Sequence, residues 1–268
     1  MIINHNLNAM NSHRNLVFNN IQSGKSSEKL SSGFRINRAA DDAAGLSISE
    51  KMRSQIKGMN QGMRNTQDGI SMVQAAEGAM NEVSDMLTRM KELSVQGSNG
   101  TYNTTDIGAM DLEYQKLANA IDAIATNFEF NGVKVLDGTA TAVTIQTSGG
   151  QADSVVIDFT DASLKTLTFG GLTDQTTALA ESLVIDDAIE TVNKGRSTLG
   201  SFQNQLEHVF NNVGVNAENL QAAESRIRDT DMAAEMMKFT KFNILQQAST
   251  AMLAQANQAP QNVLQLLR

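Results

Sequence analysis

The sequence predicts a mainly α-helical protein: a long antiparallel helical bundle or coiled coil with a small β-hairpin insert, whose N- and C-terminal helices pair. Apolar residues recur at alternating spacings of four and three over most of the 268 residues, which is the repeat of helices that pack on helices. Aromatic residues make up only 4% of the chain and proline occurs once, a composition that suits helix packing better than a large sheet. Sequence rich in β-forming residues is confined to about residues 137–177, so we expect the sheet to be a minor insert.

The first helix is predicted over residues 1–32, where an apolar ladder with Arg14 on one rung indicates a coiled-coil seam. Ser31-Ser32-Gly33 is expected to end this helix, because glycine readily adopts the left-handed conformation found after a helix C-terminus. Residues 34–40 are expected to be irregular, and Asp41-Asp42 suits the start of the next helix. The residues of the ladder are Ile3, Leu7, Met10, Val17 and Ile21.

The middle of the chain is expected to hold three further helices and the hairpin. Helical patterns cover about residues 46–96, 105–128 and 178–227, and Gly97 and Gly100 break the first of them. Residues 142–147 and 154–159 are rich in β-branched residues and flank Ser148-Gly149-Gly150, which predicts an antiparallel hairpin. The helical segments at the two ends of the chain can then pair antiparallel.

The last segment, residues 232–268, is predicted to be a helix that is apolar on more than one face. A helix of this kind must be buried on several sides, although chain ends fray unless something holds them. We therefore expect other copies of the chain to bury it. Its apolar residues include Met232, Met236, Phe239, Phe242, Leu245, Ala248, Met252, Leu253 and Ala256.

Composition and motifs exclude several classes of function. The chain has no cysteine, so disulfides, thiolate metal sites and cysteine nucleophiles are excluded, and its net charge of −8 opposes general nucleic-acid binding. Its three histidines lack a Glu-x-x-His partner, so we expect no metal, no cofactor and no catalytic residues, and hence no enzyme. No apolar run approaches the length of a membrane span, and residues 1–10 lack the basic and apolar regions of a signal peptide. We expect neither membrane insertion nor a cleaved leader.

Three groups of motifs resemble bacterial flagellins from end to end. Leu30-Ser-Ser-Gly-Phe-Arg-Ile-Asn-Arg-Ala-Ala-Asp-Asp-Ala-Ala-Gly-Leu-Ser-Ile looks like the N-terminal signature of that family. Phe130-Asn-Gly-Val-Lys-Val-Leu resembles its turn before the hairpin, and Ile244-Leu-Gln-Gln-Ala with Pro260-Gln-Asn-Val-Leu-Gln-Leu-Leu-Arg268 resembles its C-terminus. Larger flagellins carry a big variable insert where this chain has only a hairpin-sized segment. The resemblance thus implies a short flagellin without surface-exposed outer domains.

The resemblance implies a structural subunit that polymerises with its own copies into the extracellular flagellar filament used for swimming. It implies an inner-tube domain from residues 1–43 and 228–268, and an outer layer from residues 44–227. The terminal helices would be disordered in the free subunit and become ordered on assembly. A flagellin-like protein of the hook–filament junction is the alternative. The residues expected to drive polymerisation are Ile3, Leu7, Met10, Val17, Ile21, Met236, Phe239, Leu245, Met252, Leu253, Leu264 and Leu267.

The resemblance also implies several partners. The family leaves the cell unfolded through the flagellar type III export apparatus, with an export chaperone on the C-terminal helix, and meets filament cap and hook-junction proteins.

A host partner is implied by residues 87–96, which look like the segment through which many flagellins engage a vertebrate Toll-like receptor. The matching positions are Arg89 and Leu93, with Glu113 on the neighbouring helix. We expect Arg89 and Leu93 to share a helix face and to be partly exposed. The alternative interpretation is structural: Leu93 packs at the edge of the core, and Arg89 pairs with Asp85 or Glu92.

Overall fold

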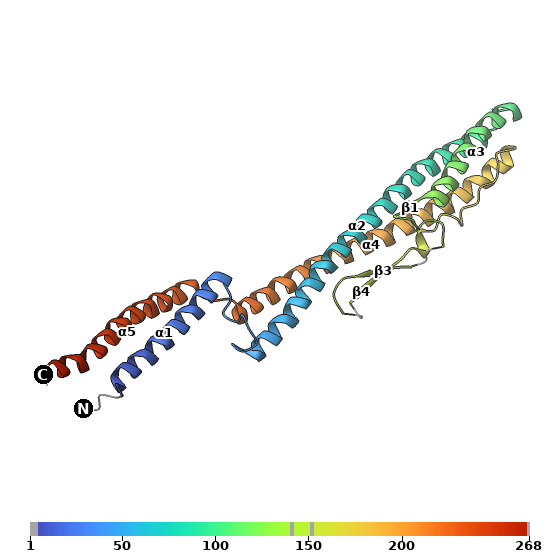
Figure 1. The fold of residues 1–268 in the computed structure, drawn as a ribbon. Helices are drawn as coiled ribbons and strands as arrows, with labels where there is room; N and C mark the ends of the chain where they lie inside the picture. Colours follow the sequence, from blue (N-terminus) through green and yellow to red (C-terminus); the bar gives the residue numbers. More distant parts are fainter. Residues whose placement is uncertain (1–4, 140–141, 151–152, 267–268) are drawn as a thin grey trace. The chain divides into compact units, whose positions relative to one another are not determined.

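The computed structural model describes residues 5–139, 142–150 and 153–266 (Figure 1). The chain forms two compact units: Met1–Ser54 with Asn219–Arg268, called the terminal unit below, and Gln55–Glu218, called the central unit. These units change over inside helices, whereas the boundaries predicted at 43/44 and 227/228 fall where helices begin and end. Ile3 and Leu267 lie outside the described residues, as does the side chain of Leu264.

Within the described residues, five α-helices make up most of the chain, which confirms the predicted mainly α-helical fold (Figure 1), and a short 3₁₀ helix, η1 (Thr160–Ala162), follows the hairpin. The helices are α1 (Leu7–Ser32), α2 (Ala43–Gly97), α3 (Thr104–Asn127), α4 (Gln175–Arg228) and α5 (Met232–Leu266). Two of the predicted ends are confirmed. Gly33 follows α1 with a φ of 75°, and the Asp42 side chain accepts a hydrogen bond from the Gly45 amide at 2.9 Å at the start of α2.

The β structure consists of two short antiparallel pairs. Strands β3 (Ala142–Gln146) and β4 (Ser154–Asp158) form the predicted hairpin, with Ala142 opposite Asp158. The sequence analysis missed a smaller pair, β1 (Glu129–Phe130) with β2 (Val133–Lys134). Asn131 and Gly132 connect its strands with φ angles of 51° and 79°. Positive φ at both positions is typical of the tight hairpin turn that an Asn-Gly pair favours.

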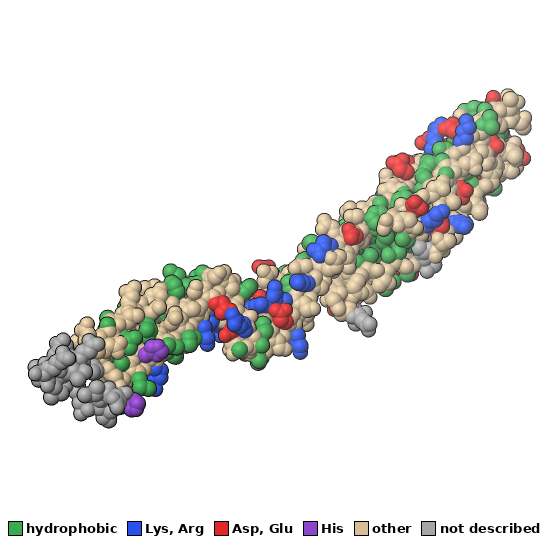
Figure 2. Space-filling model, viewed as in Figure 1, with side chains coloured by type: hydrophobic (Ala, Val, Ile, Leu, Met, Phe, Trp, Pro, Cys, Tyr) green, Lys and Arg blue, Asp and Glu red, His purple; other side chains and the backbone are tan. Residues whose placement is uncertain are grey.

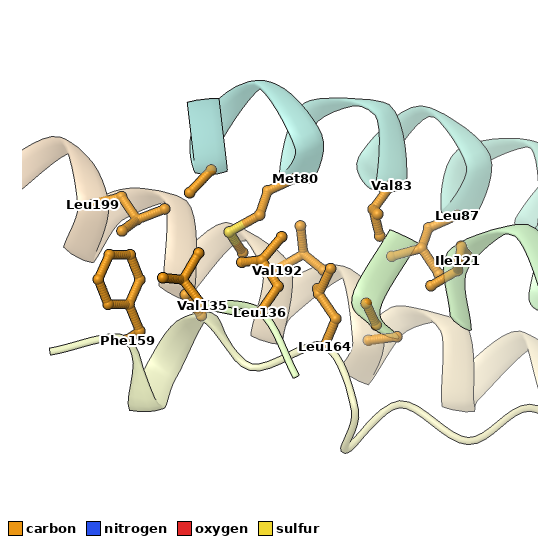
Figure 3. Close-up of a cluster of buried hydrophobic side chains, with 14 of the residues drawn as sticks. Met80, Val83, Leu87, Ile121, Val135, Leu136, Phe159, Leu164, Val192 and Leu199 are labelled. Carbon is orange, nitrogen blue, oxygen red and sulfur yellow. The ribbon is translucent and has the colours of Figure 1, made fainter. Parts of the chain in front are cut away.

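The core of the central unit is built from α2, α3, α4 and the insert together (Figure 3). Side chains from the helices and from the segments around the hairpin point toward one another, and each is almost completely buried. Full burial of an apolar side chain of this size contributes about 1.5–3 kcal/mol. The insert therefore belongs to the fold of the central unit. The labelled core residues are Met80, Val83, Leu87, Ile121, Val135, Leu136, Phe159, Leu164, Val192 and Leu199.

The hairpin lies directly against α2 because α2 carries glycines at the contact. A Cβ atom added at Gly62 would overlap the backbone carbonyl of Thr147, and one added at Gly58 would lie 3.1 Å from the Cα of Gly149. The Asn65 side-chain amide donates to the Gln146 carbonyl at 3.0 Å in the same region. Small residues here let the strand backbone approach the helix.

In the terminal unit, α1 and α5 lie side by side and run antiparallel, which confirms the predicted pairing of the terminal helices (Figure 1). The segment after α1 and the segment before α5 also pair. The Arg35 amide donates to the Arg228 carbonyl at 2.7 Å, and the Thr230 amide donates to the Gly33 carbonyl at 3.0 Å. The Arg228 guanidinium stacks over the Phe34 ring at 4.7 Å and forms an ion pair with Glu50 at 2.7 Å.

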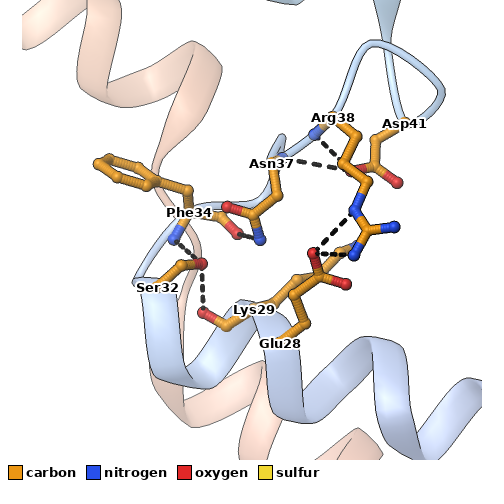
Figure 4. Close-up of polar contacts among 7 residues, drawn as sticks. All are labelled: Glu28, Lys29, Ser32, Phe34, Asn37, Arg38 and Asp41. Carbon is orange, nitrogen blue, oxygen red and sulfur yellow. Dashed lines mark hydrogen bonds and ion pairs between the residues drawn. The ribbon is translucent and has the colours of Figure 1, made fainter.

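Polar contacts hold the irregular segment between α1 and α2 in one conformation (Figure 4). The Asp41 carboxylate accepts hydrogen bonds from the amides of Asn37 and Arg38 at 3.2 and 3.1 Å. These bonds favour the ionised form and lower the pKa of Asp41. Arg38 also forms an ion pair with Glu28 at 3.0 Å, which ties the segment back to α1.

The contact at Gly62 yields a stability prediction. Gly62→Ala should lower the free energy of unfolding of the central unit by about 1–3 kcal/mol, because the added methyl group forces the hairpin away from α2. Gly78→Ala is the matched control on the same helix, where nothing lies within 4 Å of the added atom. That control should be stabilised by about 0.5–1 kcal/mol through helix propensity. Chemical denaturation followed by circular dichroism measures both, and equal effects would contradict the tight contact.

Candidate assembly surface

The two terminal helices face each other through polar side chains. Asn19 donates from its side-chain amide to the Ser249 hydroxyl at 3.0 Å, and the Ser23 hydroxyl donates to the side-chain oxygen of Asn243 at 3.0 Å. Near the end of the pair, the Asn6 side chain donates to the Ala256 carbonyl at 2.7 Å. We call the central part of this interface the polar seam. It comprises Asn19, Ser23 and Ser26 on α1, all buried, and Glu235, Asn243 and Ser249 on α5.

Glu235 is the charged member of the polar seam, and only 5% of its surface is exposed. Burial by itself raises the pKa of its carboxyl. Hydrogen bonds from Lys238 and Ser26, together with the charges of Lys238 and Lys29, outweigh burial and lower the pKa. The Lys238 ammonium lies 2.9 Å from the carboxylate. Glu235 also lies in the first turn of α5, where the helix dipole favours negative charge.

Most of the large apolar side chains of the same two helices are exposed outside the polar seam, and Figure 2 shows hydrophobic side chains along the surface of the terminal unit. Phe18 is 56% exposed and Ile21 is 54% exposed, far more than is usual for residues of their kind. We call this set the exposed apolar surface. It comprises Leu7, Met10, Val17, Phe18 and Ile21 on α1, and Met232, Met236, Met237, Ile244, Leu245 and Met252 on α5.

The predicted ladder of α1 is therefore not a seam between α1 and α5. Leu7, Met10, Val17 and Ile21 do lie on one stripe, but this stripe is exposed and a different stripe faces α5. The reason is geometric: with 3.6 residues per turn, a helix carries two separate stripes, and the sequence pattern alone does not tell which one meets the partner.

The predicted residues of α5 are distributed over several faces, as its all-round apolar pattern indicated. Met236, Leu245 and Met252 are exposed, whereas Phe239 and Leu253 are partly buried. Sequence reasoning missed the polar seam, although a signal was present. Asn19, Ser23 and Ser26 follow the same four-and-three spacing as an apolar ladder.

The structure brings Arg89 and Glu113 together but buries Leu93. The Arg89 guanidinium forms ion pairs with Glu113 at 2.9 Å and with Glu92 at 2.8 Å, and the side chains remain about half exposed. Glu92 was one of the two expected partners. Leu93 is only 2% exposed, so the expectation that it is partly exposed was wrong. It continues the buried row of Leu87 and Met90 on the inner face of α2.

The described part of the chain contains no cluster of three or more histidine and acidic residues placed to hold a metal ion. None of its helices combines the length and the apolar character that spanning a membrane requires. A groove of about 830 Å³ lies between the β3–β4 hairpin and α4, lined mainly by hydroxyl and amide side chains with His208.

Comparison with family models identifies both ends of the chain. Residues 3–141 match the bacterial flagellin N-terminal helical region, and residues 183–267 match the bacterial flagellin C-terminal helical region. Together the two matches cover most of the sequence, including α1, α2, α3 and α5.

Individual proteins match over the full length. A flagellin of Halalkalibacterium halodurans is 54% identical over 272 residues, and the alignment covers 100% of both chains. The flagellar filament 33 kDa core protein of Treponema phagedenis is 47% identical, again with 100% of both chains covered. The crystal structure of a Bacillus cereus flagellin superimposes with a TM-score of 0.52 at 39% identity, covering 60% of this chain and 94% of that one.

Proposed function

The chain belongs to the bacterial flagellin family and is a structural subunit of the flagellar filament, and from this premise we propose that α1 and α5 are the elements through which it polymerises. Both helices would become ordered when neighbouring copies bury the exposed apolar surface. The alternative, a hook–filament junction protein, is not favoured, because the relatives that match from end to end are flagellins and filament core proteins.

The observation that carries the proposal is the distribution of side chains in the terminal unit. The side chains of α1 and α5 that are fully buried are polar, while eleven large apolar side chains of the two helices are exposed. A net contribution of about 0.5–1.5 kcal/mol per hydrogen bond is small beside the cost of ordering two helices, roughly 1–2 kcal/mol per residue for the backbone. Most of the stability of a helix in a protein comes from tertiary packing of its apolar face, and the apolar stripes of α1 and α5 are exposed. The free subunit therefore lacks the contacts that would keep its ends helical.

Assembly supplies the missing contacts. Each apolar side chain that neighbouring copies bury contributes about 1.5–3 kcal/mol, so many must be buried together before ordering becomes favourable. This requirement makes addition cooperative and confines it to a growing end that already presents folded neighbours. A head-to-tail contact whose rotation does not close produces an open helical polymer. The residues proposed for polymerisation remain those of the predicted set, with Phe18, Met237 and Ile244 added from the structure.

The same surface suits the proteins that handle the subunit before and after assembly. We propose that a flagellar export chaperone covers α5 before secretion, since four exposed methionines give that helix an adaptable apolar surface. Filament cap and hook-junction proteins would contact the terminal helices at the two ends of the polymer. Export in an unfolded form through the type III apparatus would then deliver the chain to the extracellular filament.

Host recognition is proposed for the other compact unit. Arg89 and Glu113 form an exposed ion pair on neighbouring helices, which offers a Toll-like receptor both a donor and an acceptor. Leu93 is buried in the core of the central unit and would hold α2, which carries Arg89, in place. We therefore propose that the receptor touches the charged pair and that Leu93 acts through packing.

Polymerisation is tested with Ile21→Asp. The free chain should remain soluble and its central unit should be unchanged, because Ile21 lies on α1 of the terminal unit and is exposed in the single chain. Filaments should fail to form, because burying an unpaired charge among neighbours costs several kcal/mol. Electron microscopy and sedimentation measure the result. Asn20→Asp, next along the helix but outside the apolar stripe, is the control and should retain assembly. Normal filaments from Ile21→Asp would sink the proposal.

Acid sensitivity is tested at Glu235. Its pKa is lowered in the α1–α5 pair, so its stabilising contribution is complete above its ordinary pKa of 4.5 and is lost as the pH falls through the lowered value. Glu235→Gln should raise the critical concentration for assembly at pH 7, and the difference from the wild type should shrink as the pH falls below 4.5 and through the lowered pKa of Glu235. Glu190→Gln, at an exposed position of α4, is the control and should show no such pH-dependent difference. A constant difference at all pH values would contradict the assigned role.

Receptor contact is tested with Arg89→Ala and Leu93→Ala. Arg89→Ala should change stability by no more than about 1 kcal/mol, since exposed ion pairs contribute little, yet it should weaken receptor activation in a reporter-cell assay. Leu93→Ala should cost about 2–5 kcal/mol in unfolding free energy, because it leaves a cavity. Full receptor activation by a folded Arg89→Ala variant would refute the proposed contact.

A further inference from the structure

We propose that the polar seam is the specificity determinant of assembly: it selects the single register in which α1 and α5 of one chain pair. This inference rests on the proposed polymerisation and deepens it. The apolar surface would provide the free energy of association, and the polar seam would decide which side of each helix is left for the neighbours.

The first observation is that the polar seam is buried and internally satisfied. Asn19, Ser23 and Ser26 are among the few buried polar residues of the chain, and each has a partner on α5. Neutral hydrogen bonds contribute little net stability, whereas a buried polar group that loses its partner is penalised more strongly. A row of such pairs therefore discriminates between arrangements more than it stabilises any one of them.

Shifted registers break these pairs. If α5 slid by one helical turn, about four residues, Ser26 would meet Phe239 in place of Glu235. Asn19 would then meet Leu253 in place of Ser249. Phe239 and Leu253 are both partly buried. Two of the three buried polar side chains of α1 would then face apolar side chains, and Ser23 would meet Gln247 in place of Asn243.

Pairing through the wrong faces is excluded by the same groups. The exposed apolar stripes of α1 and α5 would gain contact area if they packed on each other. In a filament, that arrangement would turn Asn19, Ser23 and the carboxylate of Glu235 toward the apolar surfaces of neighbours. Glu235 is the strongest discriminator, because an ionised group tolerates burial only with its partners in place.

The chemistry of the two neutral pairs alternates between the helices and suggests a rescue experiment. The amide is on α1 in the pair Asn19–Ser249 and on α5 in the pair Ser23–Asn243. Asn19→Ser leaves two short hydroxyl side chains opposite each other. Adding Ser249→Asn restores one amide and one hydroxyl with their positions exchanged.

We expect Asn19→Ser to raise the critical concentration for polymerisation of the full chain about tenfold, the change that corresponds to one lost buried pair. The double variant Asn19→Ser/Ser249→Asn should return to within about threefold of the wild type. Asn20→Ser is the matched control, because Asn20 is exposed and adjacent on the same helix. Thermal unfolding of the central unit verifies that each variant is folded. Wild-type assembly of Asn19→Ser, or failure of the double variant to recover, would overturn the inference.

Register itself is measured with spin labels. The chain has no cysteine, so labels on Asn20→Cys and Ala251→Cys report one intramolecular distance when labelled chains are diluted into unlabelled filaments. A single distance is expected for the wild-type seam. A second population shifted by about one helical turn, roughly 5 Å, is expected when Asn19→Leu is added. An unchanged distance distribution in Asn19→Leu filaments would overturn the inference, whereas failure of the wild-type chain to polymerise would overturn the proposed function itself.

Discussion

The polar contact between α1 and α5 is the constraint on which the behaviour of the molecule depends. Because Asn19, Ser23 and Glu235 occupy the inner side of the pair, most of the large apolar side chains of both helices are exposed in the single chain. The polar side chains of the seam find their hydrogen-bond partners within one chain. The exposed apolar side chains would be buried only by neighbouring copies, as we propose. The exposed apolar surface supports the proposal that hydrophobic burial between copies drives polymerisation.

The central unit has the opposite character. Its core draws on three helices and on the segments around the hairpin, and residues such as Met80, Leu87 and Leu199 are completely buried without any other chain. Glycines at the α2–hairpin contact permit a close backbone approach that larger side chains would prevent. The chain thus combines a central unit with a buried apolar core and a terminal unit whose exposed apolar surface, as we propose, is buried by neighbouring copies.

Much of this architecture could be predicted from the sequence, because helix periodicity and termination are local properties. Gly33 and Asp42 marked helix ends correctly, and Asn131-Gly132 carried a turn signal that the sequence analysis did not use for a hairpin. Which stripe of α1 faces α5 was not predictable in the same way, since two stripes with the same spacing coexist on one helix. The exposure of Leu93 was predicted wrongly for a related reason. Its position in the repeat gives the side of α2 on which it lies, but its burial depends on which other elements pack against that side.

The pairing of the segment after α1 with the segment before α5 has a kinetic consequence. Phe34 and Asp229 form a bridge, and Arg228 contacts both Phe34 and Glu50, so the segment that follows α1 is joined to the segment that precedes α5. Because α1 and α5 both adjoin this bridge, almost no loop has to close when they pair, and their first contacts form at a high effective concentration. The pairing of α1 with α5 can therefore begin next to the Phe34–Asp229 bridge and extend toward the chain ends one helical turn at a time. In the proposed assembly, neighbouring copies would then bury the exposed faces of two helices that had already paired.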